Sequence, residues 1–232
     1  MTIPPSTAAP LQALAFLGII ALVVLALLVI VGALVARRPR LATLAGTVAV
    51  VSVAGYAVML VSLGLGSGER VLGPGEAKVF CELDCHLAYT VPRVRTTHTI
   101  GDARARGIYY VVTVRTSFDA ASVAAWRGDG ALYPNPRRAR LVDSVGHAWP
   151  VDARAQRALL ATDAQGTALE TPLRPGESYE TTLAFDVPER IEGARLELTE
   201  GGVVPRFMIG HERSPFHAKT LFALGRGFAT GR

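Results

Sequence analysis

The sequence predicts a transmembrane α-helical hairpin at the N-terminus, followed by a single all-β domain. Residues 1–66 contain no Asp, Glu or Lys, and their only charged residues are Arg37, Arg38 and Arg40. Every acidic residue lies in residues 67–232, where short apolar runs alternate with turns rich in Gly and Pro. This second part, of about 160 residues, is long enough to bury one core of its own.

Two uncharged apolar runs, Leu11–Ala36 and Leu41–Gly66, are each 26 residues long. The hydrocarbon core of a bilayer needs about 20 helical residues, so each run can cross it with some tilt. Residues 37–40 form so short a link that the two helices must be antiparallel. A cleavable signal peptide is the alternative for the first run, but no charge precedes Leu11 and the run is too long.

The arginines between the two runs predict the orientation of the hairpin. Cytoplasmic loops collect Lys and Arg, which places residues 37–40 in the cytoplasm. Residues 1–10 and the C-terminal domain then lie in the periplasm, outside the inner (cytoplasmic) membrane of a bacterium. Because neither run contains an ionisable side chain other than Tyr56, a channel or a carrier is not expected.

One side of the second run is lined with small residues. Small residues at this spacing allow another helix to approach closely. The first apolar run is one partner for this face, and a helix of another protein is the alternative. The residues of the face are Ala42, Ala45, Gly46, Ala49 and Ser52.

Residues 76–210 are expected to form the β-domain, after a linker at residues 67–75 and before a C-terminal arm at residues 211–232. The clearest strand is Ile108–Thr116, whose aromatic and β-branched residues suit a core strand. About seven or eight short strands separated by Gly and Pro turns indicate a β-sandwich. The other expected strands are Ala77–Phe80, Leu87–Val91, Arg140–Val142, Ala148–Val151, Tyr179–Val187, Ala194–Leu198 and Val203–Ile209, with short helices at Ala120–Trp126 and Ala153–Ala161.

Three stretches of the β-domain carry a family resemblance. They are the strand that ends at Thr116, Ser117 and Phe118, the strand–turn–strand at Leu141–His147, and Leu173–Ser178 followed by Phe185–Pro188. On these stretches, roughly residues 105–200 resemble the bacterial extracytoplasmic immunoglobulin-like domains that are catalogued without a known function. The resemblance implies an immunoglobulin-like β-sandwich that serves as a binding or assembly module, and the fold itself implies no activity.

Both cysteines of the chain lie in one short segment that contains Cys81, Cys85 and His86. In an oxidising periplasm they predict a local disulfide, provided that a turn brings their Cα atoms to within about 4.4–6.8 Å. Covalent haem is one alternative, although the usual attachment motif has two residues between its cysteines rather than the three found here. A copper or zinc site is the other. Further ligands for these alternatives would be Met208, His211 and His217.

The copper alternative has a resemblance of its own. A transmembrane hairpin, an outer β-domain and two cysteines four residues apart are similar to subunit II of cytochrome oxidase, which implies a dinuclear copper site. In that family a histidine follows the second cysteine by four residues, whereas this chain has Tyr89 at that position. The motif therefore departs from the family at a position that the copper site needs. A chain without a cofactor is the main expectation, and copper, zinc or haem are the alternatives.

The C-terminal arm mixes apolar and basic residues. One interpretation is that the arm packs back on its own sandwich, and the other is that it binds a partner subunit. The residues expected to make that contact are Arg213, Phe216, His217, Leu221, Phe222 and Leu224.

The charge balance and the motifs of the sequence exclude some classes of function from what we expect. The chain has 24 Lys and Arg residues and 19 Asp and Glu residues, and without the three hairpin arginines 21 basic residues face 19 acidic ones. No basic face for nucleic acid is therefore expected. No Gly-x-Ser-x-Gly motif or phosphate-binding glycine loop points to catalysis.

These observations predict a non-catalytic accessory subunit. It would bind the bilayer and the other subunits of a larger membrane complex, of the respiratory or photosynthetic reaction-centre type. One alternative is a redox protein built on Cys81, Cys85 and His86. Another is a membrane-tethered domain that binds a ligand in a pocket lined by Trp126, Trp149 and nearby tyrosines.

Overall fold

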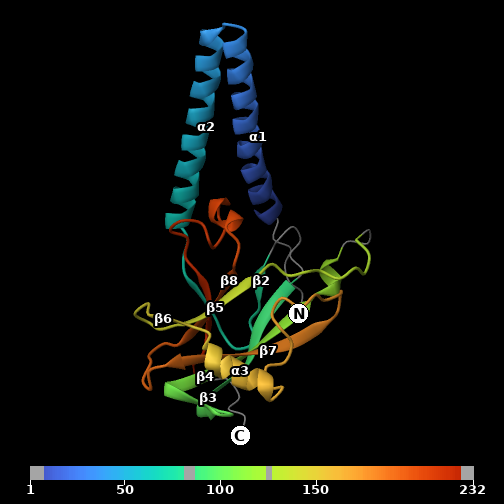
Figure 1. Cartoon of the computed structure of the whole chain (residues 1–232), viewed down its shortest axis with the longest axis vertical. Coiled ribbons are helices and arrows are strands. Elements are labelled where there is room, and N and C mark those ends of the chain that lie inside the picture. The colour runs from blue at the N-terminus through green and yellow to red at the C-terminus, as the bar shows by residue number, and fades with distance from the viewer. Residues whose placement is uncertain (1–7, 81–86, 124–126, 226–232) are drawn as a thin grey trace. The chain divides into compact units, whose positions relative to one another are not determined.

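The structure is a computed structural model of the chain, and it describes residues 8–80, 87–123 and 127–225. These residues form two compact units, coloured along the chain in Figure 1. The helical unit contains the two N-terminal helices as far as Gly68, together with Val203–Ala218. The β-unit contains Glu69–Gly202 and the chain from Lys219 onward. Val203–Ala218 therefore interrupts the β-unit in sequence but belongs to the helical unit.

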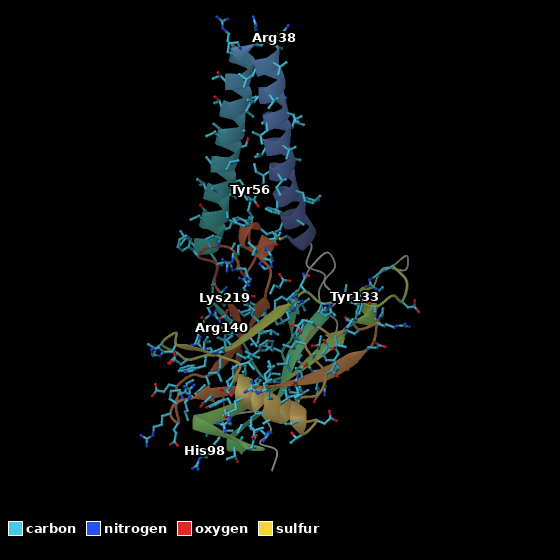
Figure 2. All side chains as sticks on the ribbon, in the orientation of Figure 1. Arg38, Tyr56, His98, Tyr133, Arg140 and Lys219 are labelled. Carbon is cyan, nitrogen blue, oxygen red and sulfur yellow. The ribbon has the colours of Figure 1, made fainter. Side chains whose placement is uncertain are left out.

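The helical unit is built on α1 (Ala8–Val35) and α2 (Pro39–Leu65), which confirms the predicted pair of apolar helices. Both are long and apolar enough to cross a membrane. Arg38 lies in the turn at the closed end of the pair (Figure 2). Pro39 begins α2 because its ring fixes a helical φ angle and its missing N–H would have no partner there in any case.

The β-unit contains two sheets, which confirms a β-sandwich. The five-stranded sheet has the order β1-β9-β8-β5-β6, and the four-stranded sheet has the order β2-β3-β4-β7. Strands β1 and β9 are parallel, and the other described pairs are antiparallel. The strands are β1 (Arg70–Leu72), β2 (Lys78–Phe80), β3 (Leu87–Ile100), β4 (Ala103–Phe118), β5 (Arg137–Val142), β6 (Ala148–Pro150), β7 (Ser178–Val187), β8 (Arg195–Glu200) and β9 (Thr220–Ala223).

Apolar side chains of both sheets form one continuous core. Burying an aliphatic or aromatic side chain of this size stabilises a fold by roughly 1.5–3 kcal/mol, so this core dominates the stability of the β-unit. Its largest fully buried members include Tyr89, Phe118, Leu141, Phe185, Leu196, Leu198 and Phe222.

Strand β4 is buried on both faces. Side chains alternate along a strand, so Val112 and Val114 enter the main core while Tyr109 and Val111 join a second cluster under helix α3 (Ala153–Ala161). The double burial explains why the sequence of this strand is a continuous apolar run rather than an alternating one. The predicted helix at Ala153–Ala161 is confirmed.

Helix α3 also protects an edge of the four-stranded sheet. The side-chain amide of Gln156 donates to the Thr182 carbonyl at 2.9 Å and accepts the N–H of Ala184 at 3.3 Å. Both residues belong to β7, which is the edge strand. The side chain thus occupies backbone groups that would otherwise be free to pair with another strand.

Several sequence predictions differ from the structure. The predicted strand at Val203–Ile209 is wrong: Val204–Phe207 forms a 3₁₀ turn, and Pro205 within it has no N–H to give to a ladder. The expected linker contains β1 and the expected arm contains β9, which pair with each other. The expected helix at Ala120–Trp126 is described only as a 3₁₀ turn at Ala120–Ser122, because residues 124–126 lie outside the described residues.

Candidate functional site

The outward faces of α1 and α2 are apolar and exposed. Leu28 in α1 is 66% exposed and Val50 in α2 is 69% exposed, and neither helix has a charged side chain within its apolar run. Such an exterior would be costly in water and is favourable in lipid. The two helices therefore indicate a membrane-anchored or exported protein.

The predicted face of small residues is the more covered side of α2. Ala42, Ala45, Gly46, Ala49 and Ser52 are all partly buried, while the residues between them are exposed. A methyl group added at Gly46 would lie 3.9 Å from Cδ1 of Ile30 in α1, an ordinary contact distance. At Gly46, this face therefore lies against α1 within the unit.

The same covered side continues toward the open end of the hairpin, where it meets Val203–Ala218. This segment, called the inserted loop below, is a series of tight turns. Backbone N–H groups donate to carbonyl groups three residues earlier, which lets the loop satisfy part of its own backbone without helix or strand. The pairs are Arg206 with Val203 at 3.1 Å, His211 with Met208 at 3.2 Å, Ser214 with His211 at 2.8 Å, and His217 with Ser214 at 3.2 Å.

Both helices of the unit contact the inserted loop. The hydroxyl of Tyr56 in α2 donates to the carbonyl of Phe207 at 2.7 Å (Figure 2). On the α1 side, a Cβ added at Gly210 would come within 2.8 Å of the side-chain nitrogen of Gln12. Gly210 has a φ of 70°, a conformation that glycine adopts without strain. The loop thus lies between the open ends of α1 and α2 (Figure 1).

A second attachment lies at the end of α2. The Ser67 hydroxyl donates to the Gly64 carbonyl at 2.6 Å and accepts the N–H of Ala218 at 2.7 Å. Gly64 is buried, and a methyl group at this position would overlap the carbonyl oxygen of Pro215. Glycine is required here because the loop backbone passes directly against the helix.

The inserted loop exposes four large apolar side chains. Two of its residues, Ile209 and Ser214, are buried and hold it together. The exposed residues are Val203 at 65%, Val204 at 55%, Phe207 at 51% and Phe216 at 69%. A loop fixed at both ends and exposing this much apolar surface is the best candidate for a binding surface in the helical unit.

The residues predicted to form a partner-binding arm fall into two groups. Arg213, Phe216 and His217 lie in the inserted loop. Leu221, Phe222 and Leu224 do not lie in an arm, because they are buried in the β-unit with exposed fractions of 4%, 1% and 5%. The correction follows from β9, which pairs with β8 and β1; Phe222 in this strand and Leu224 just after it belong to the main core.

The structure describes only some of the candidate metal and haem ligands. Cys81, Cys85 and His86 lie outside the described residues, so the disulfide and the metal alternatives stay predictions. Of the further ligands, the His211 ring nitrogen Nδ1 accepts the Arg213 N–H at 3.0 Å. Within the described ranges, no group of three His, Cys, Asp or Glu residues is placed to hold a metal ion.

A charged cluster lies inside the β-unit. The side chain of Arg137 is 0% exposed, and its guanidinium contacts Oε1 of Glu200 at 3.3 Å and the Tyr89 hydroxyl at 3.0 Å. Its carbon Cζ lies 4.3 Å from the centre of the Phe80 ring. Nearby, Lys78 donates to backbone carbonyls of β8 and of β9. Sequence reasoning missed this cluster, because a lone Arg and a lone Glu 63 residues apart carry no local signal.

The predicted ligand pocket is present only in part. Trp149 lines a shallow depression of about 460 Å³ with Arg106, Gly107 and Asp186, where Arg106 and Asp186 form an ion pair at 3.1 Å. Trp126 lies outside the described residues. Among the residues described, this depression has no tyrosine in its lining.

Comparison with known proteins gives only weak similarities. No family model matches the chain, and no curated protein matches it. A secreted protein from Mycobacterium tuberculosis, MPT63, is similar with a TM-score of 0.43 and 11% identity, over 67% of this chain and 98% of that one. The yjhA protein from Bacillus subtilis is similar with a TM-score of 0.37 and 14% identity, over 66% of this chain and 98% of that one.

Proposed function

We propose that the chain is a non-catalytic accessory subunit of a larger membrane complex. Its helical hairpin would anchor it in the inner membrane of a bacterium, and its sandwich, of the immunoglobulin-like type, would bind and stabilise the complex in the periplasm. The observation that carries the proposal is the helical unit. Its two helices expose apolar side chains and hold the inserted loop in place through specific contacts. A complex of the respiratory or photosynthetic reaction-centre type is the kind of host we expect.

The orientation rests on the hairpin turn. Arg37, Arg38 and Arg40 are the only charged residues near the membrane on that side, and Lys and Arg are retained on the cytoplasmic side. The open end of the hairpin, with the inserted loop, would then face the periplasm.

The proposed contact with the partner subunit is centred on Phe216. Its side chain is 69% exposed, and its neighbour Pro215 is held against Gly64 of α2. Arg213 and His217 lie on the same stretch. An aromatic residue beside an arginine, on a backbone that is already ordered, is typical of the residues that contribute most to protein interfaces.

The test is a mild-detergent purification of the tagged full chain from its native membranes, with bound proteins identified and metal content measured. We expect one large complex to co-purify in a fixed ratio with the wild type. Phe216→Ala should lose most of it, and Val145→Ala, which removes a side chain 79% exposed on the β-unit, should not.

Two results would contradict the proposal. A chain that purifies alone as a monomer from native membranes would have no host complex. A chain that purifies with its own copper, zinc or haem, lost in Cys85→Ser, would favour the redox alternative.

A further inference from the structure

The exposed apolar side chains of the inserted loop lie at two levels along α2. Phe207 is tied to Tyr56, whereas Pro215, beside Phe216, is tied to Gly64 near the end of the helix. We propose that the turn at Val203–Phe207 is a membrane-inserted wedge, whose Val203, Val204 and Phe207 side chains enter the outer leaflet of the bilayer. The proposal rests on the membrane anchoring of the proposed function and adds a second lipid contact to it.

Distances along α2 place this turn in the outer leaflet. With Leu41 at the inner edge of the hydrocarbon, a rise of 1.5 Å per residue puts Tyr56 about 22 Å and Gly64 about 35 Å from that edge. The hydrocarbon layer is about 30 Å thick and the whole bilayer about 40–45 Å. Phe207 is hydrogen-bonded to Tyr56, so it lies in the outer part of the hydrocarbon layer, roughly 8 Å inside its outer boundary. Pro215 lies at the level of the headgroups.

The polar groups of the turn suit that depth. In lipid, each backbone polar group that has no partner costs several kcal/mol, so a turn at this depth needs its polar groups paired. The Phe207 carbonyl accepts from Tyr56, and the N–H groups of Arg206 and Met208 donate within the turn. Pro205 has no N–H to satisfy. The same bond gives the Tyr56 hydroxyl a partner where water is scarce.

The side chains also match the chemistry of the interface. Val203, Val204 and Phe207 are each more than half exposed. Arg206 is exposed on the same turn, where its guanidinium can pair with lipid phosphates. An apolar turn with an adjacent arginine, next to two candidate spans, fits a lipid surface better than the aqueous face of a protein.

Tryptophan reporters in the full-length chain test the proposal. Purified variants would be reconstituted into phosphatidylcholine and phosphatidylglycerol vesicles, with and without bromine near the headgroup end of the acyl chains. The wild-type signal from the two native tryptophans would be subtracted. The reporters are Phe207→Trp and Val203→Trp in the wedge, Val58→Trp on the outward face of α2, and Tyr133→Trp on the β-unit, whose side chain is 74% exposed.

We expect the brominated lipids to remove most of the added emission from both wedge reporters and from Val58→Trp, and little from Tyr133→Trp. The wedge emission should also shift to shorter wavelength. Quenching of Val58→Trp with no quenching at either wedge position would overturn the wedge and leave the anchor intact. No quenching at Val58→Trp would overturn the anchor itself. Protection of Phe207→Trp from quenching once the host complex is bound would assign the surface to a protein partner and also overturn the wedge.

Discussion

The two units of the chain use apolar side chains in opposite ways. In the β-unit, Leu141 and Leu196 are 0% exposed, and the large side chains pack between sheets. In the helical unit, Leu28 and Val50 are about two-thirds exposed, and the small residues of α2 are the covered ones. The two units therefore differ in the surroundings that they suit: the β-unit hides its apolar surface from water, and the helical unit exposes an apolar surface of the kind that lipid favours.

The two units also differ in the polar side chains that they contain and in how these side chains are paired. The β-unit buries charges and matches them, as in the pair formed by Arg137 and Glu200. Within the apolar helices the polar side chains are mostly hydroxyls that donate to backbone carbonyl groups. Thr43 donates to the carbonyl four residues earlier at 3.0 Å, and Tyr56 donates to the carbonyl of Phe207. A charge can be stabilised inside the sandwich by a fixed partner. Inside a bilayer, a hydroxyl with one strong hydrogen bond costs less free energy to bury than a charge does.

The largest expected effect comes from breaking the buried ion pair. Arg137→Met leaves Glu200 buried without its guanidinium, and loss of one partner of a buried pair costs about 3–5 kcal/mol. The measurement is denaturant unfolding of the full chain in detergent, followed by the fluorescence of its two tryptophans, which both belong to the β-unit.

The matched control is Arg106→Gln, which breaks the ion pair with Asp186. The Arg106 side chain is 89% exposed, so the expected loss is below about 1 kcal/mol. Equal losses in the two variants would mean that the interior of the β-unit treats charge no differently from its surface. Replacing Arg137 and Glu200 together by Met should recover part of the stability, since neither charge of this pair is then left buried without the other.

The next effect tests the close contact within the helical unit. Gly64→Ala places a methyl group against the Pro215 carbonyl, and overpacking of this kind costs about 1–3 kcal/mol. The inserted loop should detach locally, and its amide hydrogens should exchange faster by mass spectrometry while the β-unit is unchanged.

Gly55→Ala is the control for that variant, because nothing lies within 4 Å of a methyl group added there. It should leave exchange in the inserted loop as it is in the wild type. If Gly64→Ala also leaves the exchange unchanged, the loop is not packed on α2 in the way described.

The sequence predicts those elements of the fold that are long enough to show a hydrophobic period or a distinctive composition. Two uncharged runs are enough to predict the two apolar helices. The β-sandwich also follows from its longer strands. Strands β1 and β9 have three and four residues, too few to show alternation, and their pairing joins segments far apart in the chain.

The candidate site was harder to predict for a different reason. The inserted loop is apolar enough to be read as a final strand, and only Pro205 argues locally against that reading. Its place in the helical unit depends on contacts with side chains and backbone far away in the sequence, at Gln12, Tyr56, Gly64 and Ser67. A tyrosine inside an otherwise apolar run is a usable signal, because its hydroxyl needs a partner in lipid, but the sequence does not say which residue supplies that partner.

The smallest expected effect is a pH dependence confined to the β-unit. Burial raises the pKa of Asp186, but hydrogen bonds from the backbone of Arg106 and Gly107 and from the Arg106 side chain together hold this pKa below its ordinary value of 3.8. An acid with a lowered pKa in the folded state stabilises the fold above its unfolded pKa. That stability is lost as the pH falls through the folded pKa, below about pH 4.

Asp186→Asn should therefore be less stable than the wild type at neutral pH, by less than about 1 kcal/mol, and the difference should shrink in acid. The measurement is the denaturant midpoint of the β-unit from pH 7 down to the acid transition. Asp129→Asn, at an exposed carboxylate, is the control and should follow the wild type throughout. Parallel curves for Asp186→Asn and the wild type would mean that the fold does not depend on the charge of Asp186. A shift in the exchange of the inserted loop over the same range would mean that the acid response is not confined to the β-unit.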